Sequence, residues 1–261
     1  MSAFRHPIGN AIGFRTLFVK EVKRFTSVMG QTVGAPIVTA LLYLLVFAQA
    51  LSGRATVYEG VSYTQFLVPG LIMMTVIQNA FANTSSSLIQ SKVMGNLVFV
   101  QLAPIGATEW FLAYVGAAIL RTVLVMLAML AATLPFVELR IEHPLALVGI
   151  FLLSATGLAA FGLIVGLVSQ KFDHIAAFTN FFITPLSFLS GVFYSVHALP
   201  AFWYQASHLN PFFYMIDGFR YGFFGVADVA LWQSLLWSAA FAAVMSGVAL
   251  WMLVTGYRMR K

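Results

Sequence analysis

The chain lacks cysteine and is poor in charge, and both shortages limit the class of protein it belongs to. With no cysteine among 261 residues, it has no disulfide, no thioether-linked haem and no thiolate metal ligand. Only 8% of the residues are charged, against about 25% in an average soluble domain. Apolar helical runs of about 20 residues fit bilayer-spanning helices and exclude a β-barrel. The composition therefore predicts an all-α integral membrane protein.

Motifs for catalysis and energy conversion are also missing. No lysine is followed by serine or threonine, so the chain has no G-x-x-x-x-G-K-[ST] phosphate-binding loop. No two of the five histidines are spaced i,i+4, which excludes an H-E-x-x-H zinc site. The predicted spans contain no Asp or Glu, which proton- and cation-driven carriers generally use. We therefore expect no catalytic residue, no metal and no cofactor in this chain, and a membrane pathway driven from elsewhere.

Six apolar segments are long enough to cross the bilayer. They are 31–51, 65–90, 110–136, 144–168, 174–194 and 230–255. The connecting pieces are each shorter than the roughly 50 residues of an independent domain, so 1–261 is predicted to be one membrane domain. A seventh span at 211–231 would place Asp217 and Arg220 near mid-bilayer, at about 2.5–3.5 kcal/mol each. Six spans are the better interpretation.

The distribution of Lys and Arg gives the orientation. Ten would lie on the side of both termini and three, Arg54, Arg140 and Arg220, on the other side. Basic residues are retained on the cytoplasmic side, so both termini are predicted to be cytoplasmic. The net charge of +6 then reflects this bias, and no nucleic-acid partner is expected.

The segment 1–30 has the pattern of an amphipathic helix. Helical spacing over 14–29 puts Lys20, Lys23 and Arg24 opposite an apolar face formed by Phe14, Leu17, Phe18, Val22, Phe25, Val28 and Met29. This pattern favours a helix lying in the membrane interface. The alternative is a solvated helix packed against its own protein.

A polar stripe in the second predicted span is the candidate translocation path. Its members, at helical spacing, are Gln78, Asn79, Asn83, Ser86 and Ser87. Hydrogen bonding between membrane helices explains such a stripe equally well. Arg121, inside the third span, is placed in a cavity beside these amides; snorkelling to the interface is its alternative.

The region 196–225 is rich in aromatic residues and broken by prolines, as expected for an external, re-entrant hairpin of two short helices. Asp217 and Arg220 are spaced i,i+3, so they are expected to pair on one helix. The candidate external gate consists of Pro211, Tyr214, Asp217 and Arg220. Simple anchoring of the aromatic residues at the interface is the alternative.

Three segments resemble the ABC-2 type exporter permeases, in particular their YadH-like branch. They are YTQFLVPGLIMMTVIQNAFAN (63–83), LAPIGATEWFLAYVGAAILR (102–121) and ITPLSFLSGVFYSVHALPAFWYQASHLNPFFYMIDGFRYGFFG (183–225). The resemblance covers nearly the whole chain. It implies a six-span subunit of a bacterial inner-membrane exporter that pairs as a homodimer with two copies of a cytosolic ATPase, which binds the ATP and Mg²⁺.

The resemblance also assigns roles to two segments. The N-terminal amphipathic helix would be the connecting helix, and the loop 91–109 would carry the coupling helix that docks on the ATPase. The candidate coupling positions are Lys92, Val93, Met94, Leu97 and Glu109. Family substrates include drugs, lipids, polysaccharides and lipo-oligosaccharides. Membrane lipids are expected as further partners of the chain. The alternatives are a self-contained channel or secondary transporter, and a lipid-modifying enzyme that would use His197, His208 and Asp217.

Overall fold

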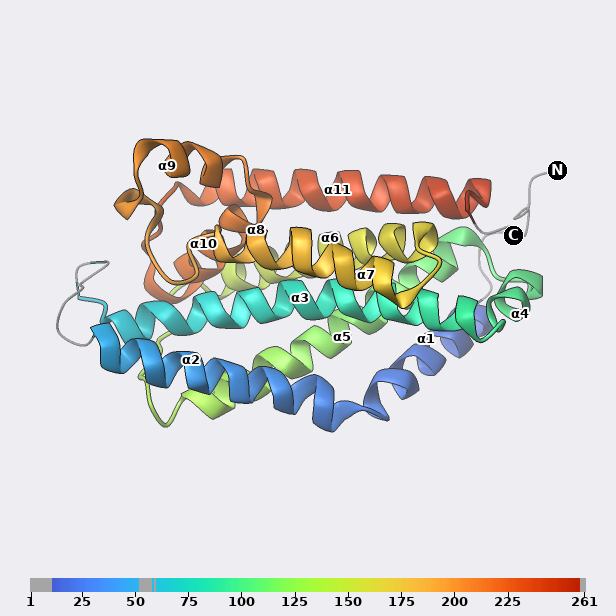
Figure 1. The fold of residues 1–261 in the computed structure, drawn as a ribbon, viewed down its shortest axis with the longest axis horizontal. Helices are drawn as coiled ribbons and strands as arrows, with labels where there is room; N and C mark the ends of the chain where they lie inside the picture. The colour runs from blue at the N-terminus through green and yellow to red at the C-terminus, as the bar shows by residue number, and fades with distance from the viewer. Residues whose placement is uncertain (1–10, 52–57, 59, 259–261) are drawn as a thin grey trace.

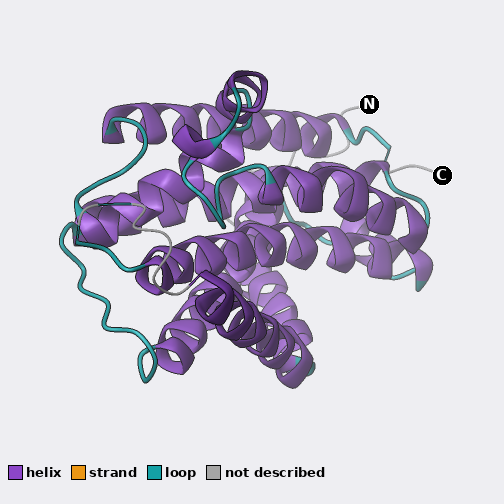
Figure 2. Ribbon diagram, turned by 60° about the vertical axis from the view of Figure 1, so that its left-hand side comes forward, coloured by secondary structure: helices purple, strands orange, loops and turns teal. Residues whose placement is uncertain are grey.

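The computed structural model describes residues 11–51, 58 and 60–258, with the side chains of 48–51 excepted. Three parts of the chain lie outside the described residues: the first ten residues of the predicted segment 1–30, most of the loop after the first span, and 259–261. The described part is a bundle of helices without β-strands (Figures 1 and 2). The predicted all-α fold is thus confirmed for the described part of the chain.

Two long helices, α3 (Tyr63–Val93) and α6 (Pro144–Val168), form the centre of the bundle. Around them lie α2 (Ala35–Leu51), α5 (Ala107–Thr133) and α11 (Leu231–Thr255), as Figure 1 shows. The short helix α4 (Leu97–Leu102) and the C-terminal end of α11 lie at one end of the bundle, the α4 end. The short helix α9 (Ala201–His208) lies at the other end, the α9 end.

The central pair packs closely because small residues face the partner helix. A Cβ on Gly162 of α6 would overlap the Thr84 hydroxyl and the Phe81 carbonyl oxygen of α3. One on Gly166 would lie 2.9 Å from the Leu88 Cβ. The Thr84 hydroxyl donates a 2.8 Å hydrogen bond to the Ala159 carbonyl of α6. Membrane helices without a hydrophobic drive to associate commonly rely on such close contacts.

Five helices in the described part are long and apolar enough to span a membrane. The predicted span 174–194 differs from the structure, which has α7 (Phe172–Phe178), a π-helical segment η2 (Thr179–Ile183) and α8 (Thr184–Phe188), of seven, five and five residues. The helix ends six residues early. Beyond Phe188 the chain turns, and Gly191 adopts a left-handed φ of 75° that stops a helix.

The N-terminal helix α1 (Ala11–Thr26) packs against α5 through Leu17 and Phe18, and its Phe25 is also buried. It ends three residues before the predicted position, so Val28 and Met29 are exposed and do not extend its apolar face. A π-helical segment, η1 (Gly30–Gly34), leads from it into α2.

The predicted hairpin contains a 3-10 turn, η3 (Val196–Ala198), then α9 and α10 (Pro211–Phe224). Asn210 begins α10: its Oδ1 accepts from the Phe212 N–H at 3.0 Å, and its Nδ2 donates to the Leu186 carbonyl at 2.6 Å. Pro211 follows in the first turn, where its missing N–H costs nothing. Thus α10 is held against the end of α8.

Candidate functional site

A cavity of about 380 Å³ lies at the edge of the bundle between α2, α3 and α8. Its lining has no charged side chain and combines apolar groups with amides and hydroxyls; it consists of Ala35, Pro36, Thr39, Ala40, Tyr43, Leu71, Met74, Thr75, Gln78, Asn79, Thr184 and Phe188. The volume of this cavity lies within the range of about 300–1,000 Å³ that is typical of small-molecule sites. The lining is suited to an uncharged or amphipathic molecule.

Two amides of α3 are the strongest polar groups of this wall. The Asn79 Nδ2 donates to the Thr75 carbonyl at 3.1 Å, which turns its oxygen towards α5. Gln78 makes no hydrogen bond to any described residue, so its donor and acceptor atoms remain available at the cavity. Gln78 and Asn79 are the two members of the predicted polar stripe that line it.

A chain of hydrogen bonds runs from Asn79 to the N-terminal helix. Arg121 of α5 donates to the Oδ1 atoms of Asn79 at 2.7 Å and Asn83 at 3.3 Å. The same Asn83 Oδ1 accepts from Arg24 of α1 at 2.9 Å, and the Asn83 carbonyl accepts from Arg24 at 2.8 Å. Arg24 also pairs with Glu21 at 3.0 Å. We call these five residues the polar chain.

The rest of the predicted path lies away from the cavity. Asn83 is buried behind the wall, Ser86 is 3.5 Å from Arg24, and Ser87 is buried between helices. Arg121 is 8% exposed and bonded to the amides, so it neither lines the cavity nor snorkels. The sequence prediction that Arg121 lies beside the α3 amides agrees with the structure, whereas its place in a cavity does not.

Glu21 and Arg24 are the site residues that the sequence reasoning missed. Arg24 was predicted on the polar side of α1, yet its guanidinium reaches α3. Glu21 is fully buried, although it is charged. A signal for Glu21 was present, because it stands four residues from both Leu17 and Phe25 and so shares their apolar face. A carboxylate on that face indicates a buried cationic partner.

The candidate coupling residues at the α4 end have diverse environments. Lys92 ends α3 and donates to the carbonyl oxygens of Gly166, Leu167 and Ser169, so it caps α6. The Glu109 carboxylate accepts from the Gly106 N–H and caps α5, which therefore begins inside the predicted loop. Leu97 is buried, whereas Val93 and Met94 are exposed.

The candidate gate residues form no single group. Pro211 and Tyr214 line a groove against α11. There the ring of Tyr214 stacks on the ring of Trp237, with 5.5 Å between the two ring centroids. Asp217 and Arg220 are buried and do not pair, which corrects the i,i+3 prediction. Each has its own partners because both side chains lie inside the bundle, where loops bring backbone groups to them.

Those partners hold the α9 end together. Arg220 donates to the carbonyls of Gly191 at 3.0 Å and Val192 at 3.3 Å, and its guanidinium lies 3.7 Å from the centre of the Phe66 ring. Asp217 accepts from the backbone N–H groups of Asp228 at 2.8 Å and Val229 at 3.0 Å. Burial raises the pKa of Asp217 to about 6, so the carboxyl is mostly ionised at neutral pH and accepts both bonds.

Asp228 is a second anchor at the α9 end. Its Oδ1 accepts from the Tyr58 hydroxyl at 3.0 Å and the Ser195 hydroxyl at 2.7 Å, and its Oδ2 from the Val196 N–H at 2.9 Å. Three donors thus meet one carboxylate from segments far apart in the sequence. Through this residue the hairpin region is fixed to Tyr58, which lies between α2 and α3.

Replacing Asp228 with asparagine is therefore expected to destabilise the protein by about 1–3 kcal/mol, since an amide nitrogen would face a donor. Thermal unfolding of the purified protein in detergent measures this effect. Asp173→Asn, at an exposed position in the first turn of α7, is the matched control and should change stability by less than about 0.5 kcal/mol. Equal stabilities of the two variants would contradict the anchoring role of Asp228.

Five helices long and apolar enough to span a membrane, together with an uncharged cavity at the bundle edge, are typical of a multi-pass membrane transport protein. Comparison with known proteins gives the family: residues 13–224 match the model described as ABC-2 type transporter, and the chain belongs to this family.

The chain is 39% identical over 220 residues to the inner membrane transport permease YadH of Escherichia coli (strain K12), covering 84% of this chain and 86% of that protein. Nodulation protein J of Rhizobium leguminosarum bv. viciae is 28% identical over 210 residues, 73% and 75% of the two chains. Nodulation protein J of Sinorhizobium fredii is 27% identical over 199 residues, 70% and 69%.

These similarities confirm the predicted family and a location in the bacterial inner membrane. Permeases of the family are transport subunits without a catalytic role of their own, and they normally work with an ATPase subunit.

Proposed function

We propose that this chain is the membrane-spanning subunit of an ATP-binding cassette exporter. It moves a hydrophobic or amphipathic substrate, such as a drug, lipid or glycan-lipid, across the cytoplasmic membrane. Two copies of a separate cytosolic ATPase bind the ATP and Mg²⁺ and supply the energy. The observation that carries the proposal is the uncharged cavity, whose amide wall the polar chain connects to α1.

The proposed topology has six crossings and both termini in the cytoplasm. The consecutive segments α7, η2 and α8 supply the sixth crossing beside the five longer helices. The cations Lys92, Lys171 and Arg258 lie together at the α4 end, which supports its cytoplasmic location. The hairpin of α9 and α10 then lies on the external side.

A homodimer of the chain would enclose the cavity, which lies at the edge of one bundle. The helices beside it expose apolar side chains, among them Leu42 and Leu45 on α2 and Phe181 in η2. Two copies facing each other through these helices would place both cavities along the shared path.

Docking of the ATPase is assigned to the outer face of α4. Phe99 and Leu102 are 71% and 78% exposed there, three residues apart and on one side of the helix. Neither residue contributes to the cavity beside α4. Exposed large apolar side chains near charged ones are typical of protein-binding surfaces. Met94 extends this surface at the end of α3, whereas its neighbour Val93 lines the cavity.

Purification from the native membrane tests the proposal. An ATPase subunit should co-purify with the chain, and Phe99→Ser with Leu102→Ser should abolish its association while the permease stays folded. Leu145→Ser, at an 89% exposed position at the start of α6, is the control and should retain the complex. Substrate flux in liposomes that contain this chain alone, unaffected by ATP, would instead show a self-contained carrier.

A further inference from the structure

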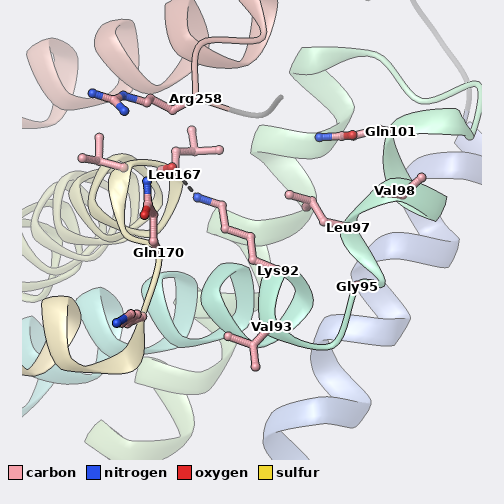
Figure 3. A pocket seen from close by; sticks show the side chains of 11 residues that line it. Lys92, Val93, Gly95, Leu97, Val98, Gln101, Leu167, Gln170 and Arg258 are labelled. Atoms are coloured by element: carbon pink, nitrogen blue, oxygen red, sulfur yellow. Dashed lines mark hydrogen bonds between the residues drawn. The ribbon is translucent and has the colours of Figure 1, made fainter. Parts of the chain in front are cut away.

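A second and larger cavity, of about 580 Å³, lies at the α4 end. Figure 3 shows Leu97, Val98 and Gln101 of α4 on one side, Leu167 and Gln170 on another, and Arg258 above. The lining joins five aliphatic side chains with three cations and no acidic residue. Such a combination matches a molecule with a negatively charged head and an apolar tail.

The three cations come from three separate elements. Lys92 ends α3, Lys171 lies between α6 and α7, and Arg258 follows α11. The ammonium of Lys92 already binds the carbonyl oxygens at the end of α6. Neither Lys171 nor Arg258 forms an ion pair within the described part of the chain. These two side chains supply the positive charge that remains uncompensated.

The position of the cavity indicates what fills it. Its wall includes Val93 and Val168, the last residues of the spanning helices α3 and α6, so it lies where spanning helices leave the hydrocarbon. Both valines are exposed, at 60% and 44%, and offer an apolar surface to an acyl chain. Basic pockets between spanning helices at this level bind anionic lipid head groups.

The two faces of α4 separate this cavity from the proposed ATPase surface. Val98 and Gln101 face the cavity, whereas Phe99 and Leu102 do not line it. A partner on the outer face of α4 therefore leaves the cavity free for a different ligand.

We propose that this cavity binds the head group of an anionic phospholipid, with Lys171 and Arg258 contacting the phosphate and the adjacent valines contacting an acyl chain. The lipid would link α4 to the end of α6 and to the segment after α11. The inference concerns the permease alone and does not depend on the presence of the ATPase.

Native mass spectrometry of the purified permease with added phosphatidylglycerol tests the site. Lys171→Gln with Arg258→Gln should weaken lipid binding roughly 30-fold, from two lost cations near the membrane surface. Arg15→Gln with Lys23→Gln removes two exposed cations from α1 and is the charge-matched control; it should change binding less than about twofold. The charge-conserving pair Lys171→Arg with Arg258→Lys should restore it.

Further measurements distinguish between the possible ligands of this cavity. Neither phosphatidylcholine nor glycerol phosphate should displace phosphatidylglycerol from the wild-type protein. Displacement by glycerol phosphate would show a free-phosphate site and overturn the lipid assignment. Equal losses of lipid binding in Lys171→Gln with Arg258→Gln and in Arg15→Gln with Lys23→Gln would show that net charge alone drives the binding, and would overturn the proposed site. Unchanged lipid binding with lost ATPase association in Lys171→Gln with Arg258→Gln would assign the cavity to the ATPase.

Discussion

Replacing Gly162 with alanine is expected to produce the largest loss of stability of any single methyl addition in the bundle, about 3 kcal/mol. The new Cβ would overlap the Thr84 hydroxyl and the backbone carbonyl of Phe81. The hydroxyl can rotate away only by giving up its bond to the Ala159 carbonyl, and the backbone oxygen cannot rotate at all. The helices α3 and α6 must therefore move apart.

Thermal unfolding in detergent, followed by size-exclusion chromatography, measures this loss. Gly149→Ala is the matched control, because Gly149 lies on the same helix and its nearest atom, Leu235 Cδ2, would be 4.0 Å from the new Cβ. Alanine favours helix over glycine by up to about 1 kcal/mol, so this variant should be neutral or slightly more stable. A Gly162→Ala protein as stable as Gly149→Ala would show that the central packing is looser than described.

Replacing Arg121 with alanine is expected to weaken the coupling between ATP hydrolysis and transport while the protein stays folded. The variant loses the two bonds that fix the amides of Asn79 and Asn83, and with them the connection from Arg24 to the cavity wall. A coupling free energy of this kind corresponds to a loss of roughly 5- to 150-fold. The measurement is the amount of substrate transported per ATP hydrolysed by the reconstituted permease–ATPase assembly.

Two comparisons make this test specific. Arg140→Ala changes an exposed arginine outside the polar chain and should leave transport per ATP hydrolysed unchanged. Adding Asn79→Ala to Arg121→Ala should cause little further loss, because residues of one network are not additive. A normal amount of transport per ATP hydrolysed in the Arg121→Ala variant would exclude the polar chain from the mechanism.

The sequence predicted helix ends well where local chemistry decides them. The span 144–168 has the same limits as α6, because Pro144 favours the first turn and the polar residues from Ser169 onward cannot continue an apolar span. The hydropathy pattern predicts that the fifth span ends at 194, whereas the chain turns after Phe188. The turn at Gly191 depends on contacts with Arg220, which local hydropathy does not contain.

Side-chain partners were harder to predict than helices. The spacing of Gln78, Asn79 and Asn83 correctly indicates a polar stripe on α3. The side chains of such a stripe still point in different directions around the helix axis, so different neighbouring elements cover different members of it. Asn79 faces the cavity, whereas Asn83 is covered by α1. Which neighbour covers which residue depends on how α1 crosses α3 and α5, and this is a property of the tertiary packing.

The two π-helical segments have a consequence for how the cavity opens. Both η1 and η2 are continuous with helices that line it, α2 and α8, whereas α3 supplies the third wall without such a segment. A π turn holds one residue more than an α turn, and such turns are often found at functional sites. Passing that extra residue along the helix would rotate and translate the side chains beyond it while the backbone stays hydrogen-bonded. The two outer walls therefore have a built-in means of changing register against a fixed third wall, so that the cavity can change shape while the glycine contacts between α3 and α6 stay intact.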